Sequence, residues 1–100
     1  MASVAAVKPF PGNGAYGAAK AGLRMLTQVL REEVRDSGIR VSAVLPGATS
    51  TDLWRGAGDE FDRSVMIKPQ SVARAVREIC LFPGNALIEE IIIRPQGGDL

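Results

Sequence analysis

Tyr16 and Lys20 are the two residues of this sequence whose types and spacing most directly suggest chemistry. They lie four positions apart, and on a helix that spacing places two side chains on one face, with Cβ atoms about 5–6 Å apart. A nearby ammonium group favours the charged form of a phenol. A tyrosine in that setting can donate or accept a proton during a reaction. Taken alone, a tyrosine and a lysine at this spacing more often mark a solvated helix face.

The segment that carries this pair has the pattern of a long helix. Residues 1–14 are rich in proline, glycine and asparagine, which predicts a loop. Beyond them an apolar residue recurs every three or four positions: Leu23, Leu26, Leu30 and Val34. This periodicity predicts a helix over residues 15–36, with Gly38 as its stop. Tyr16 and Lys20 then lie in its first turns.

Two strands and a second helix are expected after the first helix. The expected elements are a strand at 39–45, an irregular segment at 46–68 with a short helix around 59–65, a helix at 69–82 and a strand at 87–94. The first strand is β-branched and ends at Pro46-Gly47, and Pro69 suits the first turn of a helix. The second helix has one apolar face, which we expect to be buried: Val72, Ala75, Val76 and Ile79. A strand–helix–strand order predicts parallel pairing.

Composition narrows the classes of function. The 12 basic and 11 acidic residues give a net charge of +1, which argues against nucleic acid or a membrane surface as a partner. No apolar stretch approaches the roughly 20 residues of a membrane-spanning helix, so we expect a cytoplasmic protein. The absence of histidine excludes a Ser-His-Asp hydrolase within the chain, and we predict no metal site. The single cysteine, Cys80, has apolar neighbours and is expected to be a buried, unreactive thiol.

Other residues before and after the tyrosine–lysine pair have a characteristic order and spacing, which together are far more specific than the pair alone. Ser3 precedes Tyr16 by thirteen positions, and Thr51 follows Pro46-Gly47. With these elements in this order, the chain closely resembles the short-chain dehydrogenase/reductase family over essentially all of its length. The resemblance implies an α/β fold, the C-terminal portion of a doubly wound, Rossmann-like parallel sheet. It would have two strands and two main helices, with the first half of the fold absent.

The resemblance also implies a reaction and a role for each matching residue. The reaction is hydride transfer between NAD or NADP and a small molecule, interconverting a carbonyl and a secondary alcohol. Tyr16 would be the acid or base, Lys20 would favour the phenolate, and Ser3 would bind the substrate oxygen. Tyr16 and Lys20 would also contact the cofactor, Lys20 through the nicotinamide ribose. The loop at 46–68 would serve substrate and cofactor, and four of its residues would line the nicotinamide end: Pro46, Gly47, Thr49 and Thr51.

A glycine-rich turn for the dinucleotide pyrophosphate is missing from the sequence. Gly12-x-Gly14 has two glycines but follows no expected strand, so we reject it as such a turn. Residues 1–100 are therefore expected to form one partial domain, and two interpretations stay open. In one, the chain is the catalytic half of an oxidoreductase and is inactive alone. In the other, it is a truncated oligomerisation or interaction module that binds no dinucleotide.

Apolar side chains surround more of the first helix than a two-stranded sheet can cover. Three of them cannot face the sheet together with Leu23, Leu30 and Val34: Met25, Leu26 and Val29. The strand at 39–45 is also expected to leave unpaired backbone groups along one edge. Because both features recruit other chains, we expect a homo-oligomer, most simply a dimer through the helix at 15–36.

Overall fold

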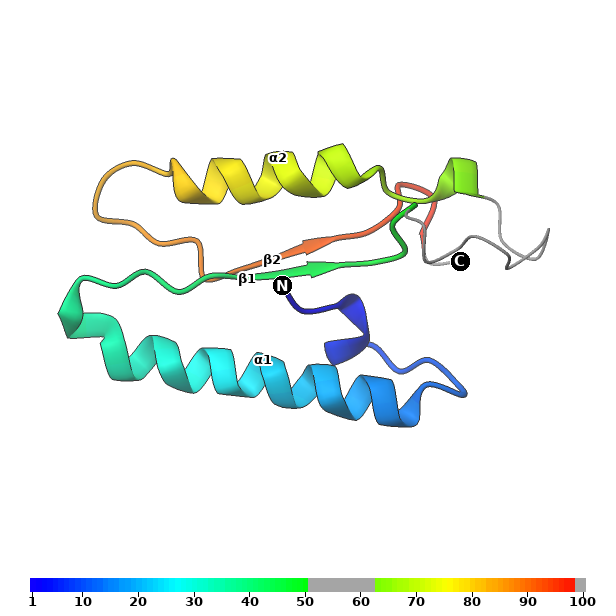
Figure 1. The fold of residues 1–100 in the computed structure, drawn as a ribbon, viewed down its shortest axis with the longest axis horizontal. Coiled ribbons are helices and arrows are strands. Elements are labelled where there is room, and N and C mark those ends of the chain that lie inside the picture. Colours follow the sequence, from blue (N-terminus) through cyan, green and yellow to red (C-terminus); the bar gives the residue numbers. More distant parts are fainter. Residues whose placement is uncertain (51–62, 99–100) are drawn as a thin grey trace.

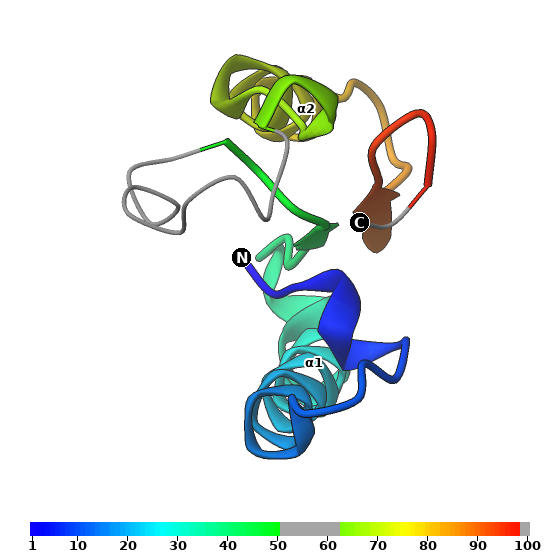
Figure 2. The same cartoon turned by 90° about the vertical axis from the view of Figure 1, so that its right-hand side faces the viewer.

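Two helices lie on opposite sides of a small parallel sheet in the computed structural model of the protein, which describes residues 1–50 and 63–98 (Figure 1). Along the chain, with η for a 3-10 helix, the elements are η1 (Val4–Ala6), α1 (Gly14–Val34), η2 (Arg35–Ser37), β1 (Ala43–Pro46), η5 (Arg63–Val65), α2 (Pro69–Cys80) and β2 (Glu90–Ile93). Figure 2 shows α2 on one face of the sheet and α1 on the other. The predicted α/β class, with two strands and two main helices, is confirmed within these residues.

The sheet is formed by β1 and β2, which run parallel, with Ala43 opposite Glu90 at the start of the register. The other edge of β1 is occupied too, because the Ala2 N–H donates to the Val44 carbonyl oxygen at 2.7 Å. The prediction of an unpaired edge is therefore wrong at Val44. The N-terminal residues fold back beside β1 and take that carbonyl.

Both strands are four residues long, shorter than the strands predicted at 39–45 and 87–94. Side-chain hydrogen bonds are found just before the ladder. Arg31 Nε donates to the Val41 carbonyl oxygen at 2.9 Å, and Ser42 Oγ donates to the Ile88 carbonyl oxygen at 2.6 Å. The backbone ladder itself begins at Ala43 and Glu90.

The helices lie close to their predicted positions, with small differences at their ends. α1 runs straight into η2, and Gly38, with φ of 75°, ends both in a left-handed conformation that glycine adopts without strain. α2 starts at Pro69 as expected and ends two residues before the predicted 82. Residues 4–6 form η1 within the segment predicted as a loop. Of the short helix expected around 59–65, residues 63–65 form η5 and the rest lies outside the described residues.

The core is divided between the two faces of the sheet. On the α2 side the buried cluster is Val44, Ile67, Val72 and Ile79. Val72 and Ile79 confirm the predicted inner face of α2, with Ala75 and Val76 half-buried beside them. On the α1 side the cluster is smaller: Ala2, Ala43 and Leu45. Burial of one large aliphatic side chain stabilises a fold by about 1.5–3 kcal/mol, so the α2 layer carries most of the apolar stabilisation.

The apolar stripe from which α1 is predicted is largely exposed in the structure. Leu23, Leu26 and Leu30 are exposed, Leu26 at 64%. On the side toward the sheet, Arg31 is buried and Arg24 is half-buried. The expectation that the leucine stripe faces the sheet is therefore wrong. The reason is the small cluster under α1, where arginine side chains that bond to the strands occupy the remaining space.

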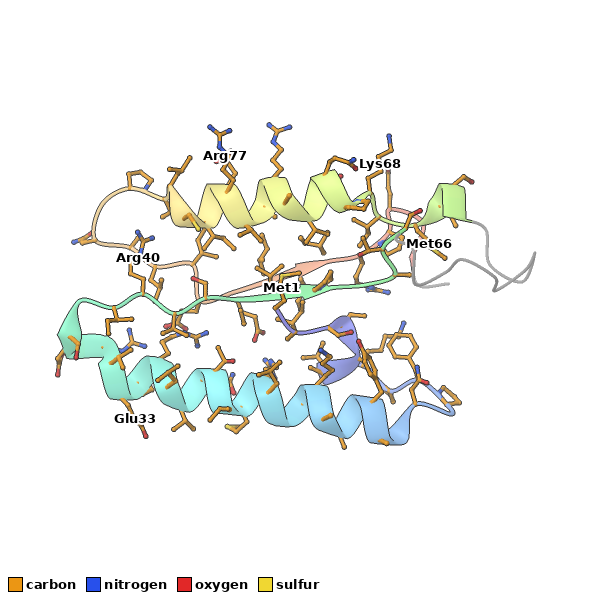
Figure 3. The ribbon with its side chains drawn as sticks, viewed as in Figure 1. Met1, Glu33, Arg40, Met66, Lys68 and Arg77 are labelled. Carbon is orange, nitrogen blue, oxygen red and sulfur yellow. The ribbon has the colours of Figure 1, made fainter. Side chains whose placement is uncertain are left out.

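The outer sides of both helices carry charged side chains, which on α1 stand beside the exposed apolar residues. Figure 3 shows Arg77 of α2 and Glu33 of α1 pointing away from the sheet. Within residues 1–50 and 63–98, no helix combines the length and apolar character needed to span a membrane.

Cys80 is exposed, so the expectation of a buried thiol is wrong. Ile79 takes the inward position at the end of α2. Successive helix residues are rotated by about 100°, and this turns Cys80 out of the layer that Ile79 enters.

Candidate active site

The first two turns of α1 bring Tyr16 and Lys20 into contact. The Lys20 Nζ atom lies 5.6 Å from the centre of the Tyr16 ring, over its face. Half of the Tyr16 surface is exposed, and Lys20 is half-buried. A cation over an aromatic ring at an exposed site contributes about 0.5–1 kcal/mol. The spacing of four residues thus produces the predicted pairing, with the tyrosine accessible to a ligand.

Ser3 is held in a defined position beside the sheet. It is the N-cap of η1, with φ of −156° and ψ of 154°, and its Oγ accepts a hydrogen bond from the Ala5 N–H at 3.2 Å. The neighbouring Ala2 is bonded to Val44 of β1. An accepting hydroxyl still has its own hydrogen to donate. Ser3 is therefore an anchored side chain with a donor left for a ligand.

η1 packs against the first turns of α1, as Figures 1 and 2 both show. Gly17, the residue after Tyr16, lies at the contact: a Cβ atom added there would meet the Ala5 carbonyl oxygen at 3.5 Å. The turn capped by Ser3 and the helix that carries Tyr16 are therefore adjacent. This packing is what brings two of the predicted site segments together from opposite ends of the N-terminal loop.

The segment after β1 is tied to two other parts of the chain. The Gly47 N–H donates to the Ile93 carbonyl oxygen at 2.7 Å. Thr49 Oγ1 donates to the Gly47 carbonyl oxygen at 3.0 Å, and Thr49 forms an isolated parallel bridge with Ile67. A Cβ at Gly47 would lie 3.2 Å from Pro95 Cδ, so glycine is needed for this close approach. Thr51 lies outside the described residues.

The predicted site segments lie toward one end of the molecule. In Figure 1 the start of α1, η1 and the carboxyl ends of β1 and β2 point to the same end. Open parallel sheets bind ligands at the carboxyl ends of their strands. Pro46 and Gly47 end β1 there, while Tyr16 and Lys20 approach from the α1 layer and Ser3 from the N-terminal turn.

Three arginines, two in α1 and one at the start of η2, connect this part of the chain to the sheet region, and the sequence reasoning did not single them out. Arg24 donates from Nε and Nη2 to both carboxylate oxygens of Glu90, at 2.7 and 2.9 Å. Arg31 Nη2 donates to the Glu89 carbonyl oxygen at 2.7 Å, and Arg35 forms an ion pair with the Glu89 carboxylate at 3.1 Å. In the sequence, these arginines could have been found from their spacing of seven and four positions, which places them on one helix face, and from the two adjacent glutamates, Glu89 and Glu90, with which they could pair.

The hydrogen bonds from Arg24 lower the pKa of Glu90 below its ordinary value, because they stabilise the carboxylate more than burial opposes it; the charge of Arg31 acts in the same direction. No group of three or more histidine, cysteine or acidic side chains that could hold a metal ion occurs in the part of the chain that the structure describes. The site therefore offers a phenol, an ammonium group, two hydroxyls and backbone amides.

The sequence pattern of the family described as short chain dehydrogenase matches residues 1–61 of the chain. The chain belongs to this family. The resemblance noted from Ser3, Tyr16, Lys20 and Pro46-Gly47 is thereby confirmed at the level of the family. Membership of the family does not by itself assign a catalytic or binding role to any residue of this chain.

Curated proteins and solved structures are similar to most or all of the chain. It is 36% identical over 100 residues to a sepiapterin reductase of Chlorobaculum tepidum, covering 100% of this chain and 41% of that protein. A betaketoacyl-[ACP] reductase structure from Bacteroides thetaiotaomicron is 32% identical, with a TM-score of 0.69, over 85% of this chain and 37% of that one. An alcohol dehydrogenase from Thermococcus sibiricus, complexed with 5-hydroxy-NADP, is 26% identical, with a TM-score of 0.77, over 94% and 39%.

These coverages define what part of the fold the chain represents. It spans about two fifths of the length of the relatives it matches, 41% for the sepiapterin reductase. With TM-scores of 0.69 and 0.77 over 85% and 94% of the chain, it has the Rossmann-like architecture of a short-chain dehydrogenase over that portion.

Proposed function

We propose that this chain supplies the acid–base residues of an NAD(P)-dependent oxidoreductase that interconverts a carbonyl and a secondary alcohol. The observation that carries the proposal is the Lys20 ammonium group 5.6 Å from the centre of the Tyr16 ring. This pair lies on a helix packed against the turn that Ser3 caps. Membership of the short-chain dehydrogenase family supports oxidoreductase chemistry of this general kind. The cytoplasm is the proposed location.

The proposed mechanism assigns each side chain one task. In the reduction, the Tyr16 hydroxyl gives its proton to the substrate oxygen as that oxygen gains negative charge; in the oxidation, the phenolate takes a proton from the alcohol. The Ser3 hydroxyl donates a hydrogen bond to the same oxygen and stabilises its charge. Lys20 holds its ammonium group 5.6 Å from the centre of the Tyr16 ring and offers it to the ribose of the dinucleotide. When bound, the dinucleotide supplies or accepts the hydride, so each turnover moves one hydride and one proton.

The residues of the chain fit the nicotinamide end of a dinucleotide. Lys20 offers an ammonium group to a ribose hydroxyl, and the Pro46–Gly47 segment ends β1 at the sheet edge where such ligands bind. Thr49, and Thr51 as predicted from the sequence, complete this set. No glycine-rich turn from a strand into a helix occurs in residues 1–50 and 63–98, so we assign the pyrophosphate contacts to the part of the relatives that this chain does not span.

A second proposal is self-association without dinucleotide binding. The observation that favours it is the exposed apolar face of α1, where Met25 is 59% and Val29 45% exposed. Apolar patches of this kind are unusual on monomers. In this proposal two copies pack through α1 around a two-fold axis. An oligomeric enzyme that binds a dinucleotide satisfies the first proposal, whereas the second requires that no dinucleotide binds.

The test of the first proposal uses a chimera in which this chain replaces the corresponding C-terminal part of the Chlorobaculum relative. Tyr16→Phe should lower turnover about 10²–10⁴-fold, the usual contribution of a positioned acid or base. Dinucleotide binding should be unchanged, because the aromatic ring under Lys20 is retained. Glu33→Gln, on the outer side of α1 (Figure 3), is the matched control and should keep full turnover. Retained turnover in Tyr16→Phe would rule out its assigned role.

Dinucleotide binding by the chimera separates the two proposals, because both expect none by the isolated chain. We expect no quenching of the single tryptophan, Trp54, by NAD or NADP up to about 1 mM, the upper end of common Michaelis constants. The chimera should show dinucleotide binding under the same conditions. If the chimera also fails to bind, the self-association proposal alone is kept.

A further inference from the structure

The side of α1 that faces the sheet is polar along most of its length. Lys20, Arg24 and Arg31 are spaced four and seven positions apart, which places them on one helix face. Arg24 and Arg31 bond to the sheet, while the large apolar side chains of α1 point to solvent. The orientation of α1 on the sheet is therefore set mainly by directed hydrogen bonds.

The bond from Arg24 to Glu90 is the most directional of these contacts. Nε and Nη2 donate to the two carboxylate oxygens at 2.7 and 2.9 Å, and both side chains are largely buried, with 32% and 23% exposed. A planar guanidinium group in this two-bond arrangement fixes direction as well as distance. The apolar cluster below α1 is small, formed by Ala2, Ala43 and Leu45, and non-directional contacts of this kind fix the rotation of a helix less than a two-bond ion pair does.

We propose that Arg24 is a positioning residue for the Tyr16–Lys20 pair. Tyr16, Lys20 and Arg24 follow one another at steps of four, and each step turns the helix by only about 40° beyond a full turn. Fixing Arg24 on Glu90 thus fixes the rotation and height of the turn that carries Lys20. The proposal rests on the function assigned above to Tyr16 and Lys20, but its test does not require turnover.

The other two arginines are too distant from Lys20 to replace Arg24 in this role. Arg31 lies 11 positions beyond Lys20 and bonds to the backbone carbonyls of Val41 and Glu89. Arg35 is 15 positions beyond Lys20, and nearly half of its side chain is exposed, beside Glu32 and Glu89. Arg35→Lys is accordingly the matched control, since it alters a guanidinium–carboxylate contact on the same helix far from the pair.

The experiment uses NMR of the 100-residue chain with ¹³C-labelled lysine. The chain has three lysines, and two of them, Lys8 and Lys20, have Nζ 5.6 Å from an aromatic ring centre, of Phe10 and Tyr16 respectively. Protons over a ring face are shifted upfield, so the ε-methylene signal of each reports its ring contact. In Arg24→Lys and Glu90→Gln, we expect the Lys20 signal to move toward its value in the urea-unfolded chain. The chemical shift of the Lys8 signal should not change in these variants. In Arg35→Lys, the chemical shifts of both the Lys8 and the Lys20 signals should remain as in the wild type.

The outcomes are distinct from those of the turnover test. An unchanged Lys20 signal in folded Arg24→Lys and Glu90→Gln would overturn the proposal. Loss of helical circular dichroism in both variants would overturn it as well, since the contact would then hold the whole fold and not the direction of one turn. Tyr16→Phe retains an aromatic ring and therefore the upfield shift of the Lys20 signal. Full turnover in Tyr16→Phe would rule out the acid–base role of Tyr16. The effect of Arg24 on the contact between Lys20 and the ring could still be measured by NMR in that case.

Discussion

At the scale of single residues, the contact between Lys20 and Tyr16 is a local consequence of helix geometry. The ammonium group lies over the ring and half of the tyrosine is exposed. The spacing of four residues on α1 brings the two side chains together, and the positioning proposed for Arg24 acts on the direction of the turn that carries Lys20. The hydroxyl of Ser3 depends instead on two anchors, its bond to the Ala5 N–H and the pairing of Ala2 with β1.

Replacing Lys20 should have a different effect from replacing Tyr16. In the chimera, Lys20→Met removes both a cation beside the phenol and a donor for the ribose. We expect turnover and dinucleotide affinity to fall together, the affinity by about 10–100-fold, since a hydrogen bond from a charged group contributes about 1.5–3 kcal/mol. Fluorescence titration and steady-state kinetics give the two quantities. Unchanged affinity would mean that Lys20 does not contact the cofactor.

Two glycines should respond to alanine with opposite signs. At Gly47 a Cβ would lie 3.2 Å from Pro95 Cδ, in a ring that cannot move aside, whereas Gly22 in α1 has no atom within 4 Å of the added Cβ. Gly47→Ala should therefore lower the free energy of unfolding by about 1–3 kcal/mol. Gly22→Ala should raise it by up to about 1 kcal/mol through helix propensity. Urea unfolding of both variants measures the contrast, and equal shifts would contradict it.

At the scale of elements, α1 and α2 are attached to the sheet by different physics. α2 buries Val72 and Ile79 against Val44, so its attachment is non-directional and depends on apolar area. α1 is attached by Arg24 and Arg31, so its attachment is directional and sensitive to charge. The two layers should therefore differ in their response to pH.

Acid should weaken the contact between α1 and β2. Arg24 lowers the pKa of Glu90 below 4.5 in the folded chain, so the stabilisation is present above that value. It is lost as the pH falls from about 4.5 through the lowered pKa. Glu90→Gln should cost about 1–2 kcal/mol at pH 7 and should lose less stability on acidification than the wild type. Urea midpoints at pH 7 and in this acid range test this, with Glu32→Gln, in an exposed pair on α1, as the control. Parallel acid profiles for Glu90→Gln and the wild type would contradict it.

At the scale of the whole molecule, the exposed apolar face of α1 is the feature that a single copy leaves unexplained. Five large apolar side chains of this helix are between 38% and 64% exposed: Leu23, Met25, Leu26, Val29 and Leu30. Their positions around the helix form a continuous surface that the sheet does not cover. Burial of this surface by a second copy is the physical basis of the proposed dimer.

The double substitution Met25→Glu, Val29→Glu should weaken self-association, because it places two carboxylates in the apolar contact. We expect sedimentation velocity at micromolar concentration to show a dimer for the wild type and a monomer for the variant. Glu78→Gln, at an exposed position of α2, should leave the dimer intact. A wild-type chain that sediments as a compact monomer would contradict the proposal.

The sequence by itself determined the features that depend on neighbours along the chain. Helix periodicity places Tyr16 beside Lys20, Pro69 opens α2, and the apolar spacing of α2 indicates the face that it buries. Family membership also follows from spaced residues within one segment, since 61 consecutive residues carry it. These properties are local because each rests on contacts within about one helical turn or on residue order alone.

Only the tertiary structure decided which face of α1 meets the sheet and where the strands begin. The leucine stripe predicts an inward apolar face, but the apolar cluster under α1 is small (Ala2, Ala43 and Leu45), and Glu90 of β2 and the preceding Glu89 are within reach of the helix, so arginines turn inward instead. The side-chain bonds to Val41 and Ile88 lie just before the ladder, which begins at Ala43 and Glu90. Both outcomes depend on residues about 45–65 positions apart, whose meeting no local pattern encodes, because burial is decided by what lies opposite a face and not by the face alone.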